Sequence, residues 1–373
     1  MTAAPDRPRA WTAAEALQDR SWQRSLSPAA LAGLDAALAH AGQTGKPLLD
    51  MDADDFPLDA SAHAELQAAF DATQKRWGFC LLRGLPVRRW TPEQTRLAAW
   101  GIGLHVGVAR TQNAASEILN DVRDAGGQYQ TRGGRGYNTR LELDFHIDFA
   151  DVVALLCRRT ARAGGRSLVT SSLAVVEEIR RHHPDLAPAL EEPLAMSWQG
   201  TQAPGEPPVY LTPLSGSRDG HTAFRTNRKN LVAAQRDFPQ APRWTERQRQ
   251  LIDTIDRLCA DPRLCLAMDL GEGDLQLLNN YVVVHSRTAF EDFEAPDEKR
   301  HLLRLWLNLP SAQPLPQAWS EAFKDTRAGA VRGGVRGSRI GPQFIAYEMR
   351  QARRLGMANA FSQRYPATLA EDQ

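Results

Sequence analysis

The sequence predicts an α+β protein whose core is a jelly roll or a similar β-sandwich flanked by helices. Short apolar runs typical of strands fill the middle and later parts of the chain, whereas its beginning and end read as helices. Long irregular connections separate these runs. Strands and helices do not alternate regularly, which argues against a doubly wound α/β fold.

Size and composition indicate one soluble globular unit. The chain has 373 residues, 42% of them apolar and 24% charged, and its formal charge of +1 argues against nucleic-acid binding. No stretch reads as an interdomain linker. We therefore expect a single domain over 1–373, with a helical part over 1–76, a jelly-roll core with insertions over 77–310, and a loop and helix over 311–373.

Cysteine usage predicts a reducing compartment. The four cysteines are scattered and form no CxxC pair: Cys80, Cys157, Cys259 and Cys265. The sequence shows neither the apolar segment of a signal peptide nor a run of membrane-spanning length. We expect a cytoplasmic protein with free thiols and no membrane partner, and the sequence leaves a homo-oligomer open.

The first hundred residues predict three helices and one strand. Ser27 is a plausible N-cap before an Ala- and Leu-rich helix, and a second helix is expected over 61–77. A short buried strand is expected within 79–86. Thr91 and Gln94 form a capping box that predicts the third helix.

The remaining elements centre on one polar loop and several apolar runs. Residues 117–140 are rich in Gly, Arg, Asn and Gln, and such a long loop in a compact domain is usually functional or disordered. Residues 199–243 are Pro- and Gly-rich and poorly periodic. The other expected elements are strands over 141–153, 154–159, 264–270, 275–287 and 300–310, a turn at Gly164 and Gly165, and helices over 171–183, 245–261 and 343–361.

A histidine and an aspartate stand two residues apart in the apolar run "LELDFHIDFADVV". In a strand, His146 and Asp148 would share one face, and burying both is costly unless they are paired or bound to a metal. The bland interpretation is a buried His–Asp hydrogen bond. Two other His-x-acid pairs, starting at His63 and His183, fall in a helix and in a charged segment.

A third candidate ligand lies far away in the sequence. His285 closes "YVVVHSRTAF", another apolar strand. Two histidines and one carboxylate form the facial triad that suits non-haem Fe(II) and leaves coordination positions open. In "KRHLLRLWLNLP", Arg300 and Arg304 share a strand face and need anionic partners, which are either internal carboxylates or a bound acid.

These residues resemble the taurine dioxygenase/clavaminate synthase-like (TauD/TfdA) family of Fe(II)- and 2-oxoglutarate-dependent oxygenases. The resemblance is carried, in order, by "FHIDFADVV", "GGRS" at 164–167, "NNYVVVHSRTAFED" and "RHLLRLWL". "GFCLLRGLP" is also similar to the first core strand of the family. The resemblance spans about Trp77 to Pro310.

The resemblance implies a double-stranded β-helix core that holds iron between its sheets. His146, Asp148 and His285 match the iron ligands, Arg300 matches the arginine that binds the distal carboxylate of 2-oxoglutarate, and Ser167 matches a hydroxyl that assists it. The implied catalytic domain uses Fe(II), 2-oxoglutarate and O2 to oxidise, by hydroxylation in the simplest case, an unactivated C–H bond of a small molecule.

The substrate side is less constrained. Arg304 matches a position that faces the primary substrate in relatives. Glu142 stands near a substrate-binding Asn of taurine dioxygenase, so taurine is not assumed as the substrate. Asp148 keeps its carboxylate, which argues against the halogenase branch. The basic stretch 223–230 and Arg304 favour a small anionic or amino-acid-like substrate.

Two Gly/Arg-rich loops add basic residues that either close over such a substrate or are simply solvated: Arg132, Arg135, Arg140, Arg327, Arg332, Arg336 and Arg339. RNA binding is disfavoured because the loops lack interleaved aromatic residues. Two alternatives remain. A Zn(II) hydrolase with the same triad would not need Arg300, and a non-catalytic ligand-binding protein on the same jelly roll would tolerate loss of a ligand.

Overall fold

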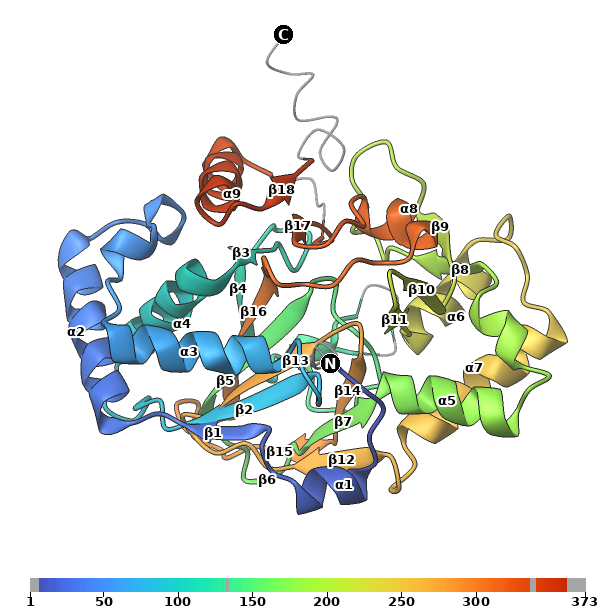
Figure 1. The fold of residues 1–373 in the computed structure, drawn as a ribbon, viewed down its shortest axis with the longest axis horizontal. Coiled ribbons are helices and arrows are strands. Elements are labelled where there is room, and N and C mark those ends of the chain that lie inside the picture. The colour runs from blue at the N-terminus through green and yellow to red at the C-terminus, as the bar shows by residue number, and fades with distance from the viewer. Residues whose placement is uncertain (1–6, 130, 132–133, 336–339, 361–373) are drawn as a thin grey trace, which may run out of the picture.

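The computed structural model describes residues 7–129, 131, 134–335 and 340–360. Two β-sheets meet at the centre as in a jelly roll, and helices of the N-terminal part cover the outer face of the larger sheet (Figure 1). A second group of helices lies beyond the smaller sheet (Figure 1). The predicted α+β jelly roll with flanking helices is confirmed. Within the described residues, no helix is long and apolar enough to cross a membrane.

The larger sheet has seven strands. Its order is β1-β2-β13-β5-β16-β3, with β4 also paired to β16; only β1 and β2 are parallel. The strands are β1 (Gln23–Ser25), β2 (Phe79–Arg83), β3 (Val108–Ala109), β4 (Leu119–Val122), β5 (Val152–Arg159), β13 (Leu275–Asn279) and β16 (His301–Asn308).

The smaller sheet is antiparallel, in the order β12-β7-β14. Its strands are β7 (Ser167–Ser171), β12 (Cys265–Met268) and β14 (Val283–Arg287). Four further strand pairs are β6 (Ala163–Gly164) with β15 (Phe290–Glu291), β8 (Leu194–Ser197) with β9 (Val209–Thr212), β10 (Ser215–Arg218) with β11 (His221–Phe224), and β17 (Ala330–Val331) with β18 (Ala358–Asn359).

Helices flank both sheets. They are α1 (Ala13–Gln18), α2 (Pro28–Thr44), α3 (Ala60–Ala72), α4 (Pro92–Val106), α5 (Ser172–His182), α6 (Arg228–Asp237), α7 (Glu246–Cys259), α8 (Ser320–Phe323) and α9 (Pro342–Arg354). Short 3-10 turns cover Leu48–Asp50, Ala53–Asp55, Gly136–Asn138, Ala187–Leu190 and Gln317–Trp319. The predicted caps Ser27 and Thr91 are confirmed, since the side chain of each accepts a hydrogen bond from a backbone N–H of the first turn. Thr245 caps α7 in the same way.

Strand β16 shows how the larger sheet separates core from cavity. Leu303, Leu305 and Leu307 pack into the apolar cluster formed with helices α2, α3 and α4. Burying one such leucine stabilises the fold by about 1.5–3 kcal/mol. Arg304 and Trp306 alternate with them and line a cavity between the sheets. The predicted alternation of this strand is therefore confirmed, and it gives the sheet one apolar face and one chemically active face.

Several predicted boundaries were wrong. The helix expected over 61–77 ends at Ala72, because Thr73 caps it. The run 275–287 breaks at residues 280–282 into β13 and β14, which belong to different sheets. The first 76 residues contain strand β1, and the poorly periodic stretch 199–243 contains α6 and the strands β9 to β11.

The segment 141–153 is not a strand over most of its length. Only its last two residues belong to β5, and His146 alone forms isolated bridges, to Asn227 and to His285. Phe145 and Ile147 are still buried in the apolar core, so the predicted alternation holds locally. The backbone partners come from separate segments instead of one neighbouring strand, which is why the ladder is interrupted.

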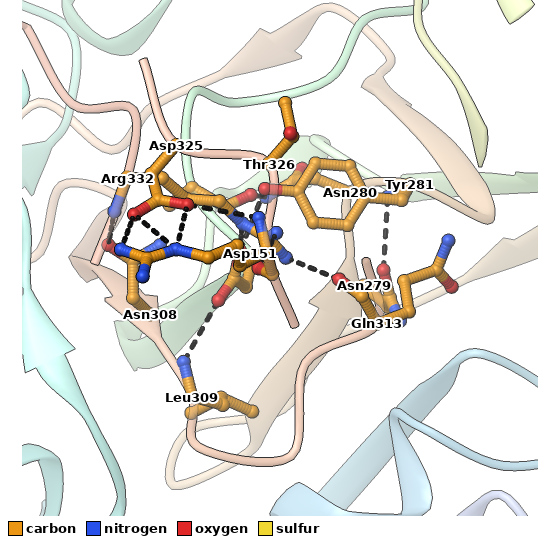
Figure 2. Close-up of polar contacts among 12 residues, drawn as sticks. Asp151, Asn279, Asn280, Tyr281, Asn308, Leu309, Gln313, Asp325, Thr326 and Arg332 are labelled. Carbon is orange, nitrogen blue, oxygen red and sulfur yellow. Dashed lines mark hydrogen bonds and ion pairs between the residues drawn. The ribbon is translucent and has the colours of Figure 1, made fainter. Parts of the chain in front are cut away.

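A buried ion pair ties the C-terminal segment to this region (Figure 2). Arg332 Nε donates to Asp151 Oδ1 at 2.7 Å, and both side chains are almost fully buried. The same carboxylate accepts from the Tyr281 hydroxyl at 2.7 Å and from the Leu309 backbone N–H at 3.0 Å. Arg332 also donates to the Gln313 carbonyl at 2.7 Å. Arg332 is thus an internal structural group, and the hypothesis that it closes over a substrate was wrong.

Candidate metal centre and its cavity

Three side chains predicted as metal ligands lie together inside the cavity. The ligand atoms of His146, Asp148 and His285 lie within 4.8 Å of one another, and this is the one such group of His, Cys, Asp or Glu in the described part of the chain. His285 Nε2 is 3.9 Å from Asp148 Oδ2. The centroids of the two imidazole rings are 4.4 Å apart. The three candidate metal ligands therefore lie close together, although they come from two elements far apart in the sequence, the segment before β5 and strand β14.

Backbone hydrogen bonds fix the relative positions of the ligands. The backbone N–H of His146 donates to the carbonyl of His285, and that of His285 donates back, each at 3.0 Å. Asp148 N–H donates to the side-chain oxygen of Asn280 at 3.0 Å, while Asn280 donates to the carbonyl of Ala150 at 3.0 Å. Because Asn280 immediately follows β13, the turn between the sheets carries the group that holds the carboxylate ligand.

One hydrogen bond also orients a ligand ring. His146 Nδ1 lies 2.8 Å from the carbonyl oxygen of Asp144, and a carbonyl can only accept, so Nδ1 carries the proton. The other nitrogen, Nε2, is then left as a lone-pair donor. This tautomer is the one that a metal ligand requires.

The electrostatics keep the donor set in its metal-binding protonation state. Burial, and then the neighbouring His146, lowers the pKa of His285 to about 3, so its ring is neutral. Burial alone would raise the pKa of Asp148, but the positive charge of Arg304 and the nearby imidazoles outweigh it and hold that pKa below its ordinary value. A neutral imidazole and a carboxylate are both ready to bind a cation.

The residues fit a divalent metal ion. Asp148 Oδ2 and His285 Nδ1 are buried and have no hydrogen-bond partner among the residues that the structure describes, although such groups are normally satisfied. Two imidazoles and one carboxylate on one side of a cavity leave positions for other ligands, as in non-haem Fe(II) sites. The alternative of a purely structural His146–Asp148 hydrogen bond is not seen among the described residues, because His146 Nδ1 bonds to the Asp144 carbonyl and Asp148 Oδ1 contacts Arg304.

Arg304 lies beside the carboxylate ligand. Its Nη1 is 3.5 Å from Asp148 Oδ1, and its Nε donates to Gln112 Oε1 at 2.7 Å. The guanidinium also stacks over the ring of Trp306, with 4.9 Å between the guanidinium carbon and the ring centroid. Arg304 therefore orients Asp148 while it lines the cavity.

Arg300 and Ser167 lie at another part of the cavity wall. Arg300 is buried, and its Nη1 has no hydrogen-bond partner. Its guanidinium packs over Phe290, 5.0 Å from the ring centroid. A Cβ built on Gly165, which has a φ of +70°, would approach Arg300 Nε to 3.0 Å, so glycine gives the arginine its room. The Ser167 hydroxyl donates to Gln276 Oε1 at 2.9 Å.

Sequence reasoning missed Arg287 of strand β14, which pairs in register with Ser167. Arg287 lines the same cavity, and its side chain donates to the backbone carbonyls of Thr288 and Leu141. Burial, and then the charge of Arg300, lowers the pKa of Arg287. Within the described part of the chain, neither Arg287 nor Arg300 forms an ion pair with a carboxylate, and a bound dicarboxylate would stabilise two such arginines that face one space.

The predicted substrate residues divide into two groups. Arg135 and Lys229 line the cavity, and Lys229 comes from the basic stretch 223–230. Glu142 is exposed and does not line the cavity. Elsewhere, Arg140 is exposed, and Arg327 pairs with Asp325 at 2.6 Å. Arg132, Arg336 and Arg339 lie outside the described residues.

Known proteins match this chain over most of its length. The family model described as taurine catabolism dioxygenase TauD, TfdA family matches residues 44–306. FR-33289 synthase of Streptomyces rubellomurinus is 28% identical over 316 residues, which cover 83% of this chain and 92% of that protein. Uridine-5'-phosphate dioxygenase of Amycolatopsis sp is 29% identical over 198 residues, 53% of this chain and 70% of that protein.

Solved structures share the fold. The non-haem iron oxygenase OrfP in complex with Fe and α-ketoglutaric acid aligns with a TM-score of 0.56 at 16% identity and covers 76% of this chain and 93% of that one. Asparagine oxygenase in complex with Fe(II), 3-hydroxyasparagine and succinate aligns with a TM-score of 0.53 at 16% identity and covers 77% and 93%.

Proposed function

The chain belongs to the TauD, TfdA family of dioxygenases, and we propose that it is a non-haem Fe(II)- and 2-oxoglutarate-dependent dioxygenase. Its reaction oxidises, by hydroxylation in the simplest case, a C–H bond of a small anionic or amino-acid-like molecule. The observation that carries this proposal is that His146, Asp148 and His285 share one cavity with Arg300, whose Nη1 has no hydrogen-bond partner among the described residues.

Each residue has a defined task in this proposal. His146, Asp148 and His285 hold the ferrous ion, which, when bound, supplies the chemistry that converts O2, 2-oxoglutarate and substrate to succinate, CO2 and hydroxylated product. Arg300 binds the distal carboxylate of 2-oxoglutarate through its fork of N–H groups. The Ser167 hydroxyl, which donates to Gln276, assists Arg300 in binding 2-oxoglutarate.

The remaining wall controls orientation and water. Arg287 adds a second guanidinium next to Arg300, and its positive charge favours a doubly charged co-substrate. Leu155, Leu302 and Trp306 form an apolar wall of the cavity. Such a wall keeps water away from the reacting atoms, which strengthens the hydrogen bonds that position the co-substrate.

Replacement of Arg300 by methionine is expected to raise the KM for 2-oxoglutarate by roughly tenfold to a hundredfold, because one charge-assisted bidentate contact is lost. Arg300→Lys should recover only part of the loss, since a point charge cannot form the fork. Steady-state succinate formation over a range of 2-oxoglutarate concentrations measures this. Arg166→Met is the matched control, because Arg166 is exposed and pairs with Asp269 at the protein surface. An unchanged KM in Arg300→Met would remove the assigned role.

The proposed reaction is tested by succinate formation. Protein loaded with Fe(II) under argon should form succinate from 2-oxoglutarate only when O2 is admitted, and one pool of candidate acids or amino acids should accelerate it. A Zn(II) hydrolase would instead turn over without O2 and would not bind 2-oxoglutarate. A non-catalytic binding protein would bind ligands but release no succinate under any pool.

The anionic substrate class rests on the basic character of the cavity. Arg135 and Lys229 face the space that iron and 2-oxoglutarate leave open, and uridine-5'-phosphate in the name of one relative is an acid. Within the proposal, residues 1–373 work as one catalytic domain in the cytoplasm, where the four free cysteines remain thiols. Analytical ultracentrifugation tests for a homo-oligomer.

A further inference from the structure

The cavity carries more positive charge than the proposed reaction uses. Apart from the histidines, the charged side chains among its described lining residues are one carboxylate, Asp148, and five basic groups: Arg135, Lys229, Arg287, Arg300 and Arg304. A ferrous ion adds two positive charges and 2-oxoglutarate removes two, so the excess persists. Arg287 and Arg300 are buried and the other three basic side chains are partly buried, and charges of one sign in such a space are costly without a counter-ion. Part of this positive charge therefore has no counter-ion in the proposed function.

Three of the five basic groups have assigned partners. Arg304 contacts Asp148, and Arg300 with Arg287 faces the co-substrate. Arg135 and Lys229 remain, and among the described residues neither forms an ion pair with a carboxylate. The charge of Asp144 raises the pKa of Lys229 only weakly. The Asp144 carboxylate accepts a hydrogen bond from the Tyr129 hydroxyl.

Lys229 and Arg135 both have donor capacity to spare. Lys229 Nζ donates to the carbonyl of Tyr129 at 2.6 Å and to that of Gly134, which uses two of the three ammonium hydrogens. Arg135 Nη2 donates to the carbonyl of Gln199 at 3.3 Å, and among the described residues this bond uses one of its five N–H donors. Backbone carbonyls hold both groups in place without neutralising them.

The two cations also repel each other and Arg304. Burial, and then the charge of Arg135, lowers the pKa of Lys229 to about 8. Burial, and to a lesser degree the charge of Arg304, lowers the pKa of Arg135. A bound anion would reverse both effects, because it replaces repulsion by attraction. Arg304, Arg135 and Lys229 thus line one cavity, and Arg304 also contacts the iron ligand Asp148.

A neutral donor completes the group. Gln199 lines the cavity, its Nε2 is buried without a partner, and its φ of +55° is unusual for a residue that is not glycine. Backbone strain of this kind persists where the surrounding structure enforces it and often marks a binding site. Its carbonyl is the acceptor that holds Arg135.

We propose that Arg135, Lys229 and Gln199 form a second anion subsite, which binds a doubly charged tetrahedral oxyanion of the primary substrate, a phosphate monoester or a phosphonate. This rests on the proposed function, because iron and 2-oxoglutarate fill the rest of the cavity. Two separate cations and an amide donor match three oxygens that carry two negative charges. A carboxylate or a sulfonate would leave one cation unbalanced.

The test is calorimetric titration of the protein loaded with Fe(II) and saturating 2-oxoglutarate under argon at pH 7.2, below the pKa of Lys229. The probes are methyl phosphate, which is largely dianionic at this pH, methylphosphonate, which can lose its second proton on binding, and methanesulfonate, which has nearly the same shape but one charge. The dianions are expected to bind at least about tenfold more tightly than methanesulfonate, as one additional charge-assisted hydrogen bond provides.

Lys229→Met and Arg135→Met should each weaken dianion binding by roughly tenfold or more. Arg228→Met is the matched control, because Arg228 is adjacent on α6 but pairs with Asp253 and Asp256 outside the cavity. Circular dichroism checks that each variant is folded. If Lys229→Met disturbs the loop whose carbonyls Lys229 binds, the result for Arg135→Met decides the test.

Equal affinity for methanesulfonate and methylphosphonate would overturn the subsite, and so would an equal loss in Arg228→Met. Displacement of 2-oxoglutarate by the dianion would also overturn it, because the dianion would then occupy the Arg300 site. Titration of 2-oxoglutarate itself comes first. Failure at that step contradicts the proposed function, whereas normal 2-oxoglutarate binding without dianion preference contradicts the subsite alone.

Discussion

Replacing Asp148 with alanine is expected to abolish iron-dependent succinate formation and to weaken Fe(II) binding by more than about a hundredfold. Loss of an outer partner of a metal ligand already costs roughly 10–100-fold in affinity, and here a ligand itself is lost. Asp148 is the only carboxylate of the triad, so the two neutral imidazoles would face the cation alone. Arg304 would also lose its anionic contact and leave a positive charge beside the metal.

Metal titration under argon, with Co(II) as an oxygen-stable probe, and the succinate assay measure the two effects. The chain offers a matched control in its other His-x-Asp sequence, because Asp185 follows His183 by two residues and is exposed. Asp185→Ala should bind metal and form succinate like the unmodified protein. Iron-dependent turnover retained in Asp148→Ala would contradict the assignment of the metal centre.

The local pattern around His146 and Asp148 predicted their neighbourhood but not their conformation. Alternation with Phe145 and Ile147 correctly directs the two polar side chains toward the cavity. The strand assignment was wrong because ladder formation depends on segments that the local pattern does not contain. His285 pairs with His146 across 139 residues of chain, and the side chain of Asn280 takes the place of a backbone partner for Asp148.

Loop composition predicted which side chains line the cavity less well than strand periodicity did. Arg327 and Arg332 belong to the same Gly/Arg-rich run, yet the first is largely exposed and the second is fully buried against Asp151, which lies 181 residues earlier. Arg287 was missed because it is the last residue of the ligand strand β14, beyond the apolar run of that strand, where apolar periodicity no longer distinguishes inward from outward positions. Glu142 was chosen by its place in a family pattern, and the structure leaves it exposed.

Arg332→Met is expected to lower the free energy of unfolding by about 3–5 kcal/mol, which is the usual cost of removing one partner of a buried ion pair. The carboxylate of Asp151 would remain buried with only the Tyr281 hydroxyl and the Leu309 N–H as donors. The carbonyl of Gln313 would also lose its donor. Urea unfolding of the metal-free protein, followed by circular dichroism, measures the change.

Arg327→Met is the control, because it makes the same substitution in the same loop at a side chain that is 60% exposed. Asp325 is buried, but it keeps the backbone N–H of Arg327 as a donor, and the guanidinium that is removed lies in water, so this variant should lose only about 1 kcal/mol. Equal destabilisation by both substitutions would mean that chain entropy or loop packing, and not the buried pair, sets the cost.

The double variant Asp151→Asn, Arg332→Met separates the ion pair from the hydrogen bonds around it. Asparagine removes the buried negative charge, and its side-chain oxygen still accepts from Tyr281 or from Leu309. The double variant should therefore be less destabilised than the sum of the two single variants by at least about 1 kcal/mol. Strict additivity would show that Asp151 and Arg332 do not interact energetically.

A coupled pair would also connect the C-terminal segment to the metal ligand Asp148. Asp151 follows Asp148 by three residues, and the Gly334 N–H donates to the Phe149 carbonyl at 2.7 Å. The C-terminal segment would then help to hold the metal ligand in place.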